Sequence, residues 1–145
     1  MKGEKVLYSS NSDEYLTPED LFCQLDDEFH FTLDAAATKE NRKCERYYSL
    51  EDSGLDHSWG GEVVFCNPPY SKIGKWVEKA FYEGQKDNTV VVLLIPSRTD
   101  TRWFHNYIHH RSEIRFVKGR LRFNSMGGNA PFPSMIVIFR GAERK

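Results

Sequence analysis

The chain has 145 residues, of which 39% are hydrophobic and 28% charged, with a net charge of −1 and three cysteines. Length and composition predict one soluble globular domain over residues 1–145, and no apolar run approaches the roughly 20 residues that a membrane span needs. Because the N-terminus lacks a signal-peptide stretch and the cysteines form no zinc motif, we expect a cytoplasmic protein without a metal site.

The N-terminal part of the chain is predicted to form a loose lead-in and then a helix. Residues 1–12 are expected to be the lead-in. Thr17 suits the cap of the helix, and Pro18 suits its first position because no N–H is needed there. His30–Asp34 then predicts a short strand that ends in a carboxylate, and residues 45–48 are a second candidate strand.

The next predicted elements are a strand and a helix. Glu62–Cys66 contains the apolar run Val63-Val64-Phe65-Cys66, which begins with two β-branched residues and favours a strand. After a turn, Ser71 is placed to cap a helix that ends near Gly84. This helix is expected because apolar residues recur at helical spacing, namely Ile73, Trp76, Val77, Ala80 and Phe81.

The rest of the chain continues the alternation of strands and helices. Residues 89–95 are a continuous apolar run, which is typical of a strand covered on both faces. A helix around residues 103–108 and strands at 114–118 and 135–139 follow. The alternation predicts an α/β, Rossmann-like fold: an open, mostly parallel sheet with helices on both faces and an antiparallel C-terminal strand.

The segment Asn67-Pro68-Pro69-Tyr70 carries the sharpest chemical signal. This segment, residues 67–70, is called the corner below. It follows one predicted strand and Asp34 ends another, so both are expected at one edge of the sheet. Ligands of open α/β sheets bind at this edge, beyond the carboxyl ends of the strands. The exocyclic amine of adenine is a poor nucleophile because its lone pair is delocalised into the ring. The Asn67 side-chain oxygen and the Pro68 carbonyl can accept its two hydrogens, and two prolines hold these acceptors in place. Tyr70 offers the base a flat face.

Six segments form an ordered set along the chain: Tyr15-Leu16-Thr17-Pro18, Leu33-Asp34-Ala35-Ala36-Ala37, Cys66-Asn67-Pro68-Pro69-Tyr70-Ser71, Leu94-Ile95-Pro96, Thr101-x-Trp103-Phe104 and Gly119-Arg120-Leu121-x-Phe123. With this set, over roughly residues 14–140, the chain resembles the phage-type DNA N6-adenine methyltransferase (Dam-like) family of class I methyltransferases. The corner alone is shared with release-factor glutamine methyltransferases and some RNA methyltransferases. The resemblance implies an adenine-specific DNA methyltransferase that uses S-adenosyl-L-methionine, leaves S-adenosyl-L-homocysteine as product, and needs no metal.

The resemblance also implies roles for single residues. Asn67, Pro68, Pro69 and Tyr70 would hold an adenine flipped out of the duplex during direct methyl transfer. The cofactor would lie against Tyr15, Thr17, Pro18, Asp34, Ala35 and Asn67. Either Glu51 or Asp52 would bind the hydroxyls of its adenosine.

One segment departs from the pattern of most class I enzymes, which place a glycine-rich turn after the first strand. This chain has Leu33-Asp34-Ala35-Ala36-Ala37 there, and alanine resists a positive φ. We therefore expect the cofactor to meet a modified loop. A helix cap is the alternative role for Asp34.

Positive charge gathers in the C-terminal third. Residues 98–145 hold 10 basic and 3 acidic side chains, a net +7, whereas residues 1–97 carry −8. This asymmetry predicts a DNA-facing surface whose phosphate contacts are sensitive to salt, and a charged face exposed only to solvent is the alternative. The candidate DNA-binding residues are Ser71, Arg98, Arg102, Arg120, Arg122 and Phe132, with Arg111, Arg115 and Lys118 as further phosphate contacts. Phe132 would buttress the flipped base, and the alternative for its loop, residues 124–133, is a simple hairpin connection. A structural salt bridge is the alternative for Arg120.

Two other interpretations stay open. The enzyme could act on RNA or on a protein glutamine, whose nitrogen poses the same electronic problem. The missing glycine turn also allows a catalytically silent DNA-binding module of the same fold. No separate target-recognition domain is expected in 145 residues, and a homodimer would enlarge the DNA surface.

Overall fold

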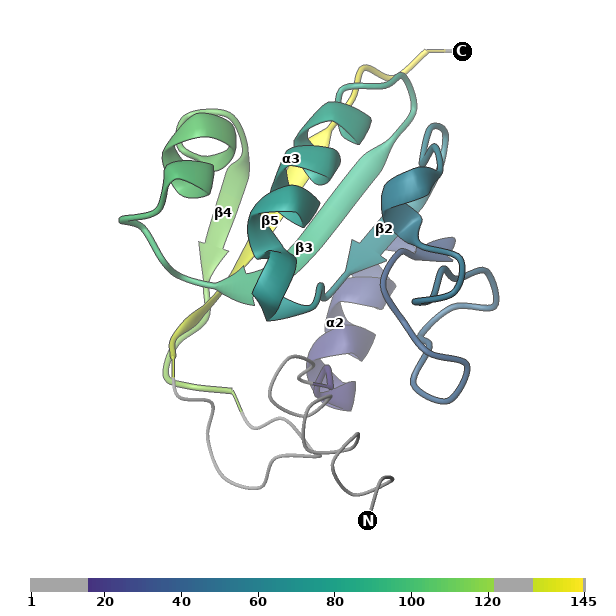
Figure 1. Cartoon of the computed structure of the whole chain (residues 1–145), viewed down its shortest axis with the longest axis horizontal. Coiled ribbons are helices and arrows are strands. Elements are labelled where there is room, and N and C mark those ends of the chain that lie inside the picture. The colour runs from purple at the N-terminus through teal and green to yellow at the C-terminus, as the bar shows by residue number, and fades with distance from the viewer. Residues whose placement is uncertain (1–15, 122–131, 145) are drawn as a thin grey trace.

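The computed structural model describes residues 16–121 and 132–144, which form a five-stranded sheet with helices on both faces (Figure 1). The strands are β1 (Leu33–Asp34), β2 (Val63–Cys66), β3 (Val90–Pro96), β4 (Glu113–Phe116) and β5 (Ser134–Arg140). Their spatial order is β1-β2-β3-β5-β4. β1, β2 and β3 run parallel, and β5 runs antiparallel to β3 and β4. The predicted Rossmann-like sheet with an antiparallel C-terminal strand is confirmed.

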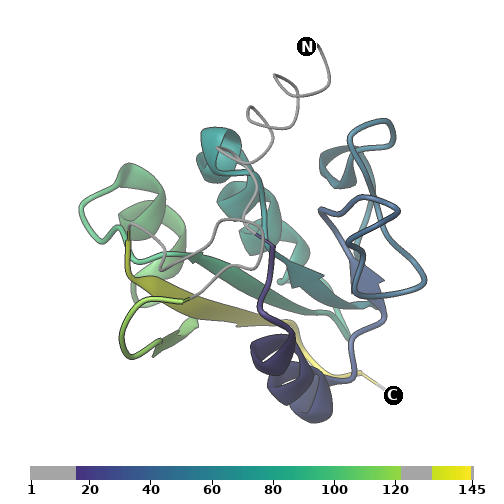
Figure 2. The ribbon, with the colours of Figure 1, turned by 90° about the horizontal axis from the view of Figure 1, so that it is seen from below.

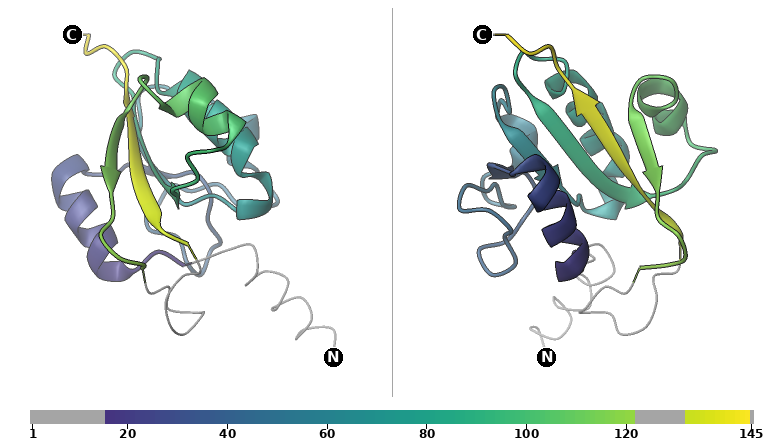
Figure 3. Two further views of the ribbon diagram at one scale, coloured as in Figure 1. Left: turned by 90° about the vertical axis from the view of Figure 1, so that its left-hand side faces the viewer. Right: turned by 180° about the vertical axis from the view of Figure 1, so that it is seen from behind.

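β3 is the centre of two apolar layers, as its continuous apolar sequence predicts. On one face, Val91, Leu93 and Ile95 pack under α3 (Ile73–Glu83) and η3 (Phe104–Ile108). On the other face, Val92 and Leu94 pack against α2 (Glu19–Phe29), and all five side chains are fully buried. Figures 2 and 3 show α2 alone on one side of the sheet and α3 on the other. Helices therefore cover both faces, as predicted.

α2 begins one residue later than the sequence suggests. Pro18 takes the cap position, because its backbone is extended (φ −59°, ψ 135°), and no side chain caps the helix. The predicted cap at Thr17 and first helical position at Pro18 are therefore wrong. The carboxylates of Glu19 and Asp20 lie in the first turn, where they interact favourably with the positive end of the helix dipole.

α3 is likewise not capped as predicted. A 3-10 turn, η2 (Tyr70–Lys72), takes up the residues after the two prolines, and Lys72 occupies the cap position without a side-chain hydrogen bond. The predicted cap at Ser71 is wrong because that residue lies inside this turn. α3 ends at Glu83, and Gly84 follows as its C-cap, where the sequence predicts the end.

β1 is shorter than predicted. His30 follows α2 with a left-handed backbone (φ 58°), which an extended strand does not accommodate. Only Leu33 and Asp34 pair with β2. Residues 45–48 contribute a single parallel bridge between Tyr47 and Asp34 in place of the predicted strand.

The remaining helical segments are short. η1 (Gly54–Asp56) is a 3-10 turn, and the helix predicted around residues 103–108 has π geometry in η3. Its residues Phe104 and Ile108 are buried in the core, so the predicted apolar side is present. Among the helices of residues 16–121 and 132–144, none combines the length and apolar character that crossing a bilayer requires.

Candidate functional site

Two strand ends meet at one edge of the sheet and open into a cavity. Asp34 ends β1 and pairs in register with Phe65, so Asn67 follows the end of β2 at the same edge. The cavity has a volume of about 360 Å³. Its walls comprise Leu16, Thr17, Glu19, Asp34, Ala36, Ala37, Glu40, Asn41, Arg42, Lys43, Ser49, Leu50, Ser53, Phe65, Asn67, Pro69 and Trp76. The predicted meeting of Asp34 and Asn67 at one edge is therefore observed.

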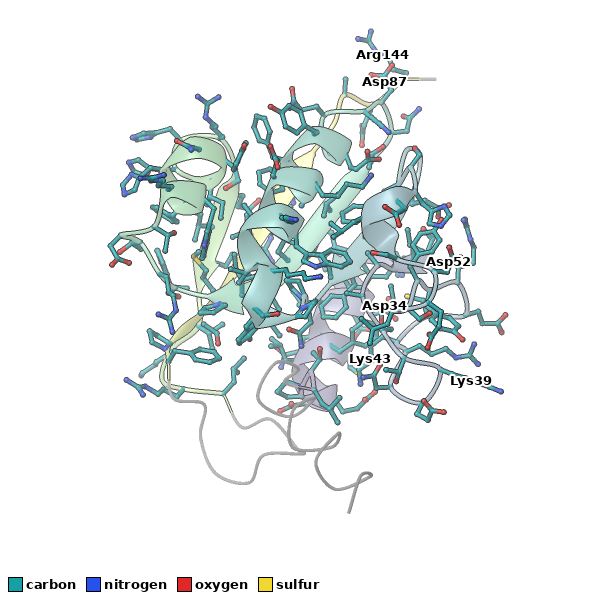
Figure 4. The ribbon with its side chains drawn as sticks, in the orientation of Figure 1. Asp34, Lys39, Lys43, Asp52, Asp87 and Arg144 are labelled. Atoms are coloured by element: carbon teal, nitrogen blue, oxygen red, sulfur yellow. The ribbon has the colours of Figure 1, made fainter. Side chains whose placement is uncertain are left out.

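Asp34 is a buried carboxylate on the wall of this cavity, with only 3% of its surface exposed. Its Oδ2 accepts the backbone N–H of Lys43 at 2.9 Å, and its Oδ1 accepts that of Ala36 at 3.4 Å. Burial raises the pKa of Asp34 to about 6, although the two N–H donors oppose the shift. Figure 4 shows Asp34 and Lys43 lying close together. The carboxylate thus ties the loop to the end of β1.

The loop after β1 replaces the glycine-rich turn of most class I enzymes. No helix begins after Asp34, so the alternative role of this residue as a helix cap is not observed. Among the described residues other than glycine, a positive φ occurs only at His30, Asn88 and His110. Residues 35–37 therefore adopt ordinary backbone angles that alanine tolerates.

Close packing of the chain at Gly54 shapes the base of this loop. A Cβ at Gly54 would lie 2.3 Å from the carbonyl oxygen of Ala35, so only glycine permits the two backbones to approach. Ala35, a predicted cofactor contact, is completely buried here. Its neighbours Ala36 and Ala37 line the cavity instead.

The corner at residues 67–70 divides between the cavity and the protein interior. Asn67 and Pro69 line the cavity, whereas Pro68 is buried. The Asn67 Nδ2 donates a hydrogen bond of 2.9 Å to the Thr17 Oγ1, which joins the corner to the segment before α2. The Tyr70 ring, half-buried, meets Phe132 edge-on with ring centroids 5.1 Å apart.

The two acidic residues predicted at the adenosine hydroxyls lie in different places. Asp52 Oδ1 lies 2.5 Å from His57 Nε2, and Asp52 lines neither cavity. Glu51 lines a second cavity of about 320 Å³, which shares Ser49, Leu50 and Glu40 with the first. Of the two alternatives, Glu51 is thus the one beside a cavity.

Several cavity residues carry charges that the sequence did not point to. Glu40 lines both cavities. Glu19 accepts a hydrogen bond of 2.5 Å from the Lys43 ammonium, which lowers the pKa of Glu19. The ammonium group also lies 5.6 Å from the centre of the Phe22 ring. No motif marks these residues. The path of the loop brings Glu40 and Lys43 to the wall, and Glu19 lies there in the first turn of α2.

Basic side chains follow the strands that end at the same edge. Arg98 and Arg102 come after β3, and Lys118 and Arg120 come after β4, which runs in the same direction. These four side chains form no ion pair with another described residue. Arg115 instead binds Glu28 and Glu113 at 2.7 Å, and these carboxylates raise its pKa. Ser71 lies in η2 at this edge, while the predicted contacts Tyr15 and Arg122 lie outside the described residues.

Comparisons with known proteins identify a family and several relatives. A family model described as "DNA N-6-adenine-methyltransferase (Dam)" matches residues 5–144. A DNA N-6-adenine-methyltransferase of Escherichia phage T1 is 34% identical over 111 residues, which cover 75% of this chain and 46% of the phage protein. The chain therefore spans less than half the length of that relative. A protein of the same name from Haemophilus phage HP1 (strain HP1c1) is 29% identical over 138 residues, 90% of this chain and 80% of the relative. The putative methyltransferase YfdM of Escherichia coli (strain K12) is 35% identical over 65 residues, 40% of this chain and 71% of the relative.

Proposed function

This chain belongs to the DNA N-6-adenine-methyltransferase (Dam) family, and from this membership we propose that it methylates N6 of adenine in DNA with S-adenosyl-L-methionine as donor. The observation that carries the proposal is the position of Asn67. This residue lines the same cavity as the buried carboxylate of Asp34, so an acceptor for the target amine lies beside a place for a cationic donor.

The walls of the cavity fit the donor chemically. S-adenosyl-L-methionine carries an ammonium group and a sulfonium group, and the latter supplies an electrophilic methyl when the molecule is bound. The carboxylates of Asp34 and Glu40 offer negative charge to these two groups, while Glu19 is paired with Lys43. Arg42, also on the wall, offers positive charge to the carboxylate of the donor. Phe65 and Trp76 offer apolar surface. The second cavity extends this space past Glu40 and Leu50, and its Glu51 is suited to accept hydrogen bonds from ribose hydroxyls.

The corner would activate the target amine by accepting hydrogen bonds from it. The Asn67 Oδ1 and the Pro68 carbonyl would take the two N6 hydrogens, which favours a pyramidal nitrogen with an available lone pair. The prolines fix the backbone before the base arrives, and Pro69 has an extended backbone with φ −64°. The methyl would pass from sulfur to N6 as the S–CH3 bond breaks, which leaves S-adenosyl-L-homocysteine. No side chain is assigned as a general base, because the N6 proton would leave to solvent after transfer.

The base would stack on Tyr70. A buried Phe132 supports this ring from its edge, so the aromatic face is held in one orientation. An adenine stacked inside a duplex cannot reach this face, and we therefore propose that the base is flipped out. Phe132 would then support the Tyr70 ring, and the base would stack on the face of Tyr70 away from Phe132.

DNA would bind along the basic edge. Arg98, Arg102, Lys118 and Arg120 surround the carboxyl ends of β3 and β4, where phosphates would be drawn toward the corner. Each phosphate contact would steepen the slope of log K against log salt concentration by about 0.9. A homodimer and a cytoplasmic location stay predictions.

The decisive experiment is methylation of plasmid DNA by the purified protein with radiolabelled donor, followed by mapping of N6-methyladenine at single-base resolution. We expect Asn67→Ala to lower the rate about 100- to 1,000-fold, the range for removing one preorganised hydrogen-bonding group, while donor binding by calorimetry persists. Asn106→Ala, the same change at an exposed position of η3, is the matched control.

The outcomes separate the alternatives. Near-normal turnover of Asn67→Ala would refute the role of the corner. Transfer of label to RNA or to a protein glutamine, but not to DNA, would replace the proposed substrate. Absence of heat on titration with the donor would indicate a silent DNA-binding module instead.

A further inference from the structure

Thr17 makes a contact that its place in the sequence does not reveal. Its Oγ1 accepts the Nδ2–H of Asn67 at 2.9 Å, across 50 positions of the chain. Thr17 is 6% exposed, so water has little access to replace the hydroxyl. A residue at the entrance to α2 is thus bonded to the side chain that would accept hydrogens from the target amine.

The chemistry of the two side chains makes this bond a restraint. The carboxamide of asparagine turns over a broad range about its last torsion, so its plane needs an external partner. Threonine is stiff at χ1 because its Cβ is branched, and the adjoining Pro18 fixes the following backbone. Since the carboxamide is planar, holding Nδ2 also fixes where Oδ1 lies.

We propose that Thr17 is a positioning residue, which holds the Asn67 carboxamide in the plane in which Oδ1 meets an N6 hydrogen of adenine. The inference rests on the proposed function and adds a residue to it. Thr17 acts through Asn67, and the hydroxyl itself need not touch the base. This assignment differs from the role as a cofactor contact that the family resemblance implies for Thr17.

The positioning role and the cofactor-contact role predict different results for a Thr17 variant. Thr17 also lines the cavity, so a cofactor contact would appear as weaker donor binding. A positioning role would appear in kcat, with the dissociation constant of the donor and the KM for DNA nearly unchanged. Misplacement of a reacting group can cost about a hundredfold in rate even without loss of binding.

The test compares Thr17→Val, Thr17→Ser and Thr89→Val with the wild type. Valine keeps the shape of threonine and removes the hydroxyl, whereas serine keeps the hydroxyl. Thr89 is the matched control, because it is completely buried and accepts the Gly61 N–H at 2.8 Å near the opposite edge of the sheet. For each protein, kcat and KM for methylation, the donor Kd and the melting temperature are measured.

We expect Thr17→Val to lower kcat about 30- to 100-fold with a donor Kd within twofold of the wild type, and Thr17→Ser to recover kcat to within about threefold. Thr89→Val should melt earlier and keep its kcat. The inference is overturned if Thr17→Val keeps kcat, if serine does not restore it, or if weaker donor binding accounts for the loss. A wild type that methylates no DNA would refute the proposed function and this inference together, while an active wild type with an equally active Thr17→Val refutes the inference alone.

Discussion

The two walls of the cavity are built by different kinds of interaction. The strand wall contains the end of β2, where Val64, Phe65 and Cys66 are at most 1% exposed, and its geometry follows from sheet pairing and apolar burial. The loop wall, residues 35–53, has no helix or named strand. It is tied down by polar groups, among them the Asp34 carboxylate and a reciprocal pair of hydrogen bonds between Thr38 and Asn41.

Because of this difference, the two walls should respond differently to changes in pH and ionic strength. Apolar burial depends little on pH or ionic strength near room temperature, because no charge changes when the surface is removed from water. Hydrogen bonds to a carboxylate and ion pairs change with protonation and with salt. The strand wall is therefore expected to hold the corner in place under conditions that loosen the loop wall.

The largest effect is expected at Gly54, where the loop crosses Ala35. Gly54→Ala places a Cβ 2.3 Å from a backbone oxygen, so one of the two segments must move. We expect a loss of about 3 kcal/mol of unfolding free energy or more, at the upper end of the usual range of about 1–3 kcal/mol for overpacking because the clash is with backbone, together with weaker donor binding. Urea denaturation and calorimetry measure the two effects.

A glycine beside the strand wall provides the control for this change. At Gly74 in α3, a Cβ would lie 3.4 Å from Trp103, an ordinary contact. Gly74→Ala should stabilise the fold by about 0.4–1 kcal/mol. Equal effects of the two substitutions would contradict the distinction between the walls.

A second, pH-dependent effect is expected from Asp34. Its pKa is about 6 in the folded protein against 3.8 for an ordinary aspartate, so the folded state holds the proton more tightly between these values. The contribution of Asp34 to stability is therefore largest below pH 4 and falls as the pH rises through about 6. Each pKa unit corresponds to about 1.4 kcal/mol, and the unfolded group is already partly ionised at pH 4, so the change between pH 4 and pH 7 is about 2 kcal/mol.

The measurement is urea denaturation of the wild type and Asp34→Asn between pH 4 and pH 7. Other carboxylates titrate in both proteins, so the quantity of interest is the difference between the two proteins at each pH. We expect the advantage of the wild type over Asp34→Asn to shrink as the pH rises. A difference that stays constant across the range would show that burial of Asp34 does not govern the loop wall.

The smallest effect is expected from the ion pair that joins the loop wall to α2. Glu19 is 68% exposed and its partner Lys43 is 17% exposed, so water and salt screen their attraction. Glu19→Gln should cost at most about 1 kcal/mol, and the cost should shrink at high salt. Urea denaturation at two salt concentrations measures it, with Glu45→Gln on the same loop as control. A larger cost at high salt would argue against an electrostatic origin.

The strand wall was also the part that sequence could predict. Strands predicted at residues 62–66, 89–95 and 135–139 are observed within one residue at each end, because apolar burial decides them. Asp34 and Asn67 could be placed at one edge because parallel strands end together.

The loop wall could not be predicted in the same way. Its path depends on the bond between Asp34 and Lys43, nine positions apart, and on the close approach at Gly54. Neither leaves a periodic signal. The left-handed backbone of His30, which shortens β1, and the 3-10 turn around Ser71 are equally local events that propensity does not reveal.

The reversed direction of β5 has a consequence for how such a protein can diversify. β4 ends and β5 begins at the edge that holds Asn67, as the bond of 3.1 Å from the Val117 N–H to the Ser134 oxygen shows. Chain inserted between Leu121 and Phe132 enters and leaves the fold beside the corner. Lengthening or exchanging that connection would add surface beside Asn67, and every strand pair of the ladder could stay as it is.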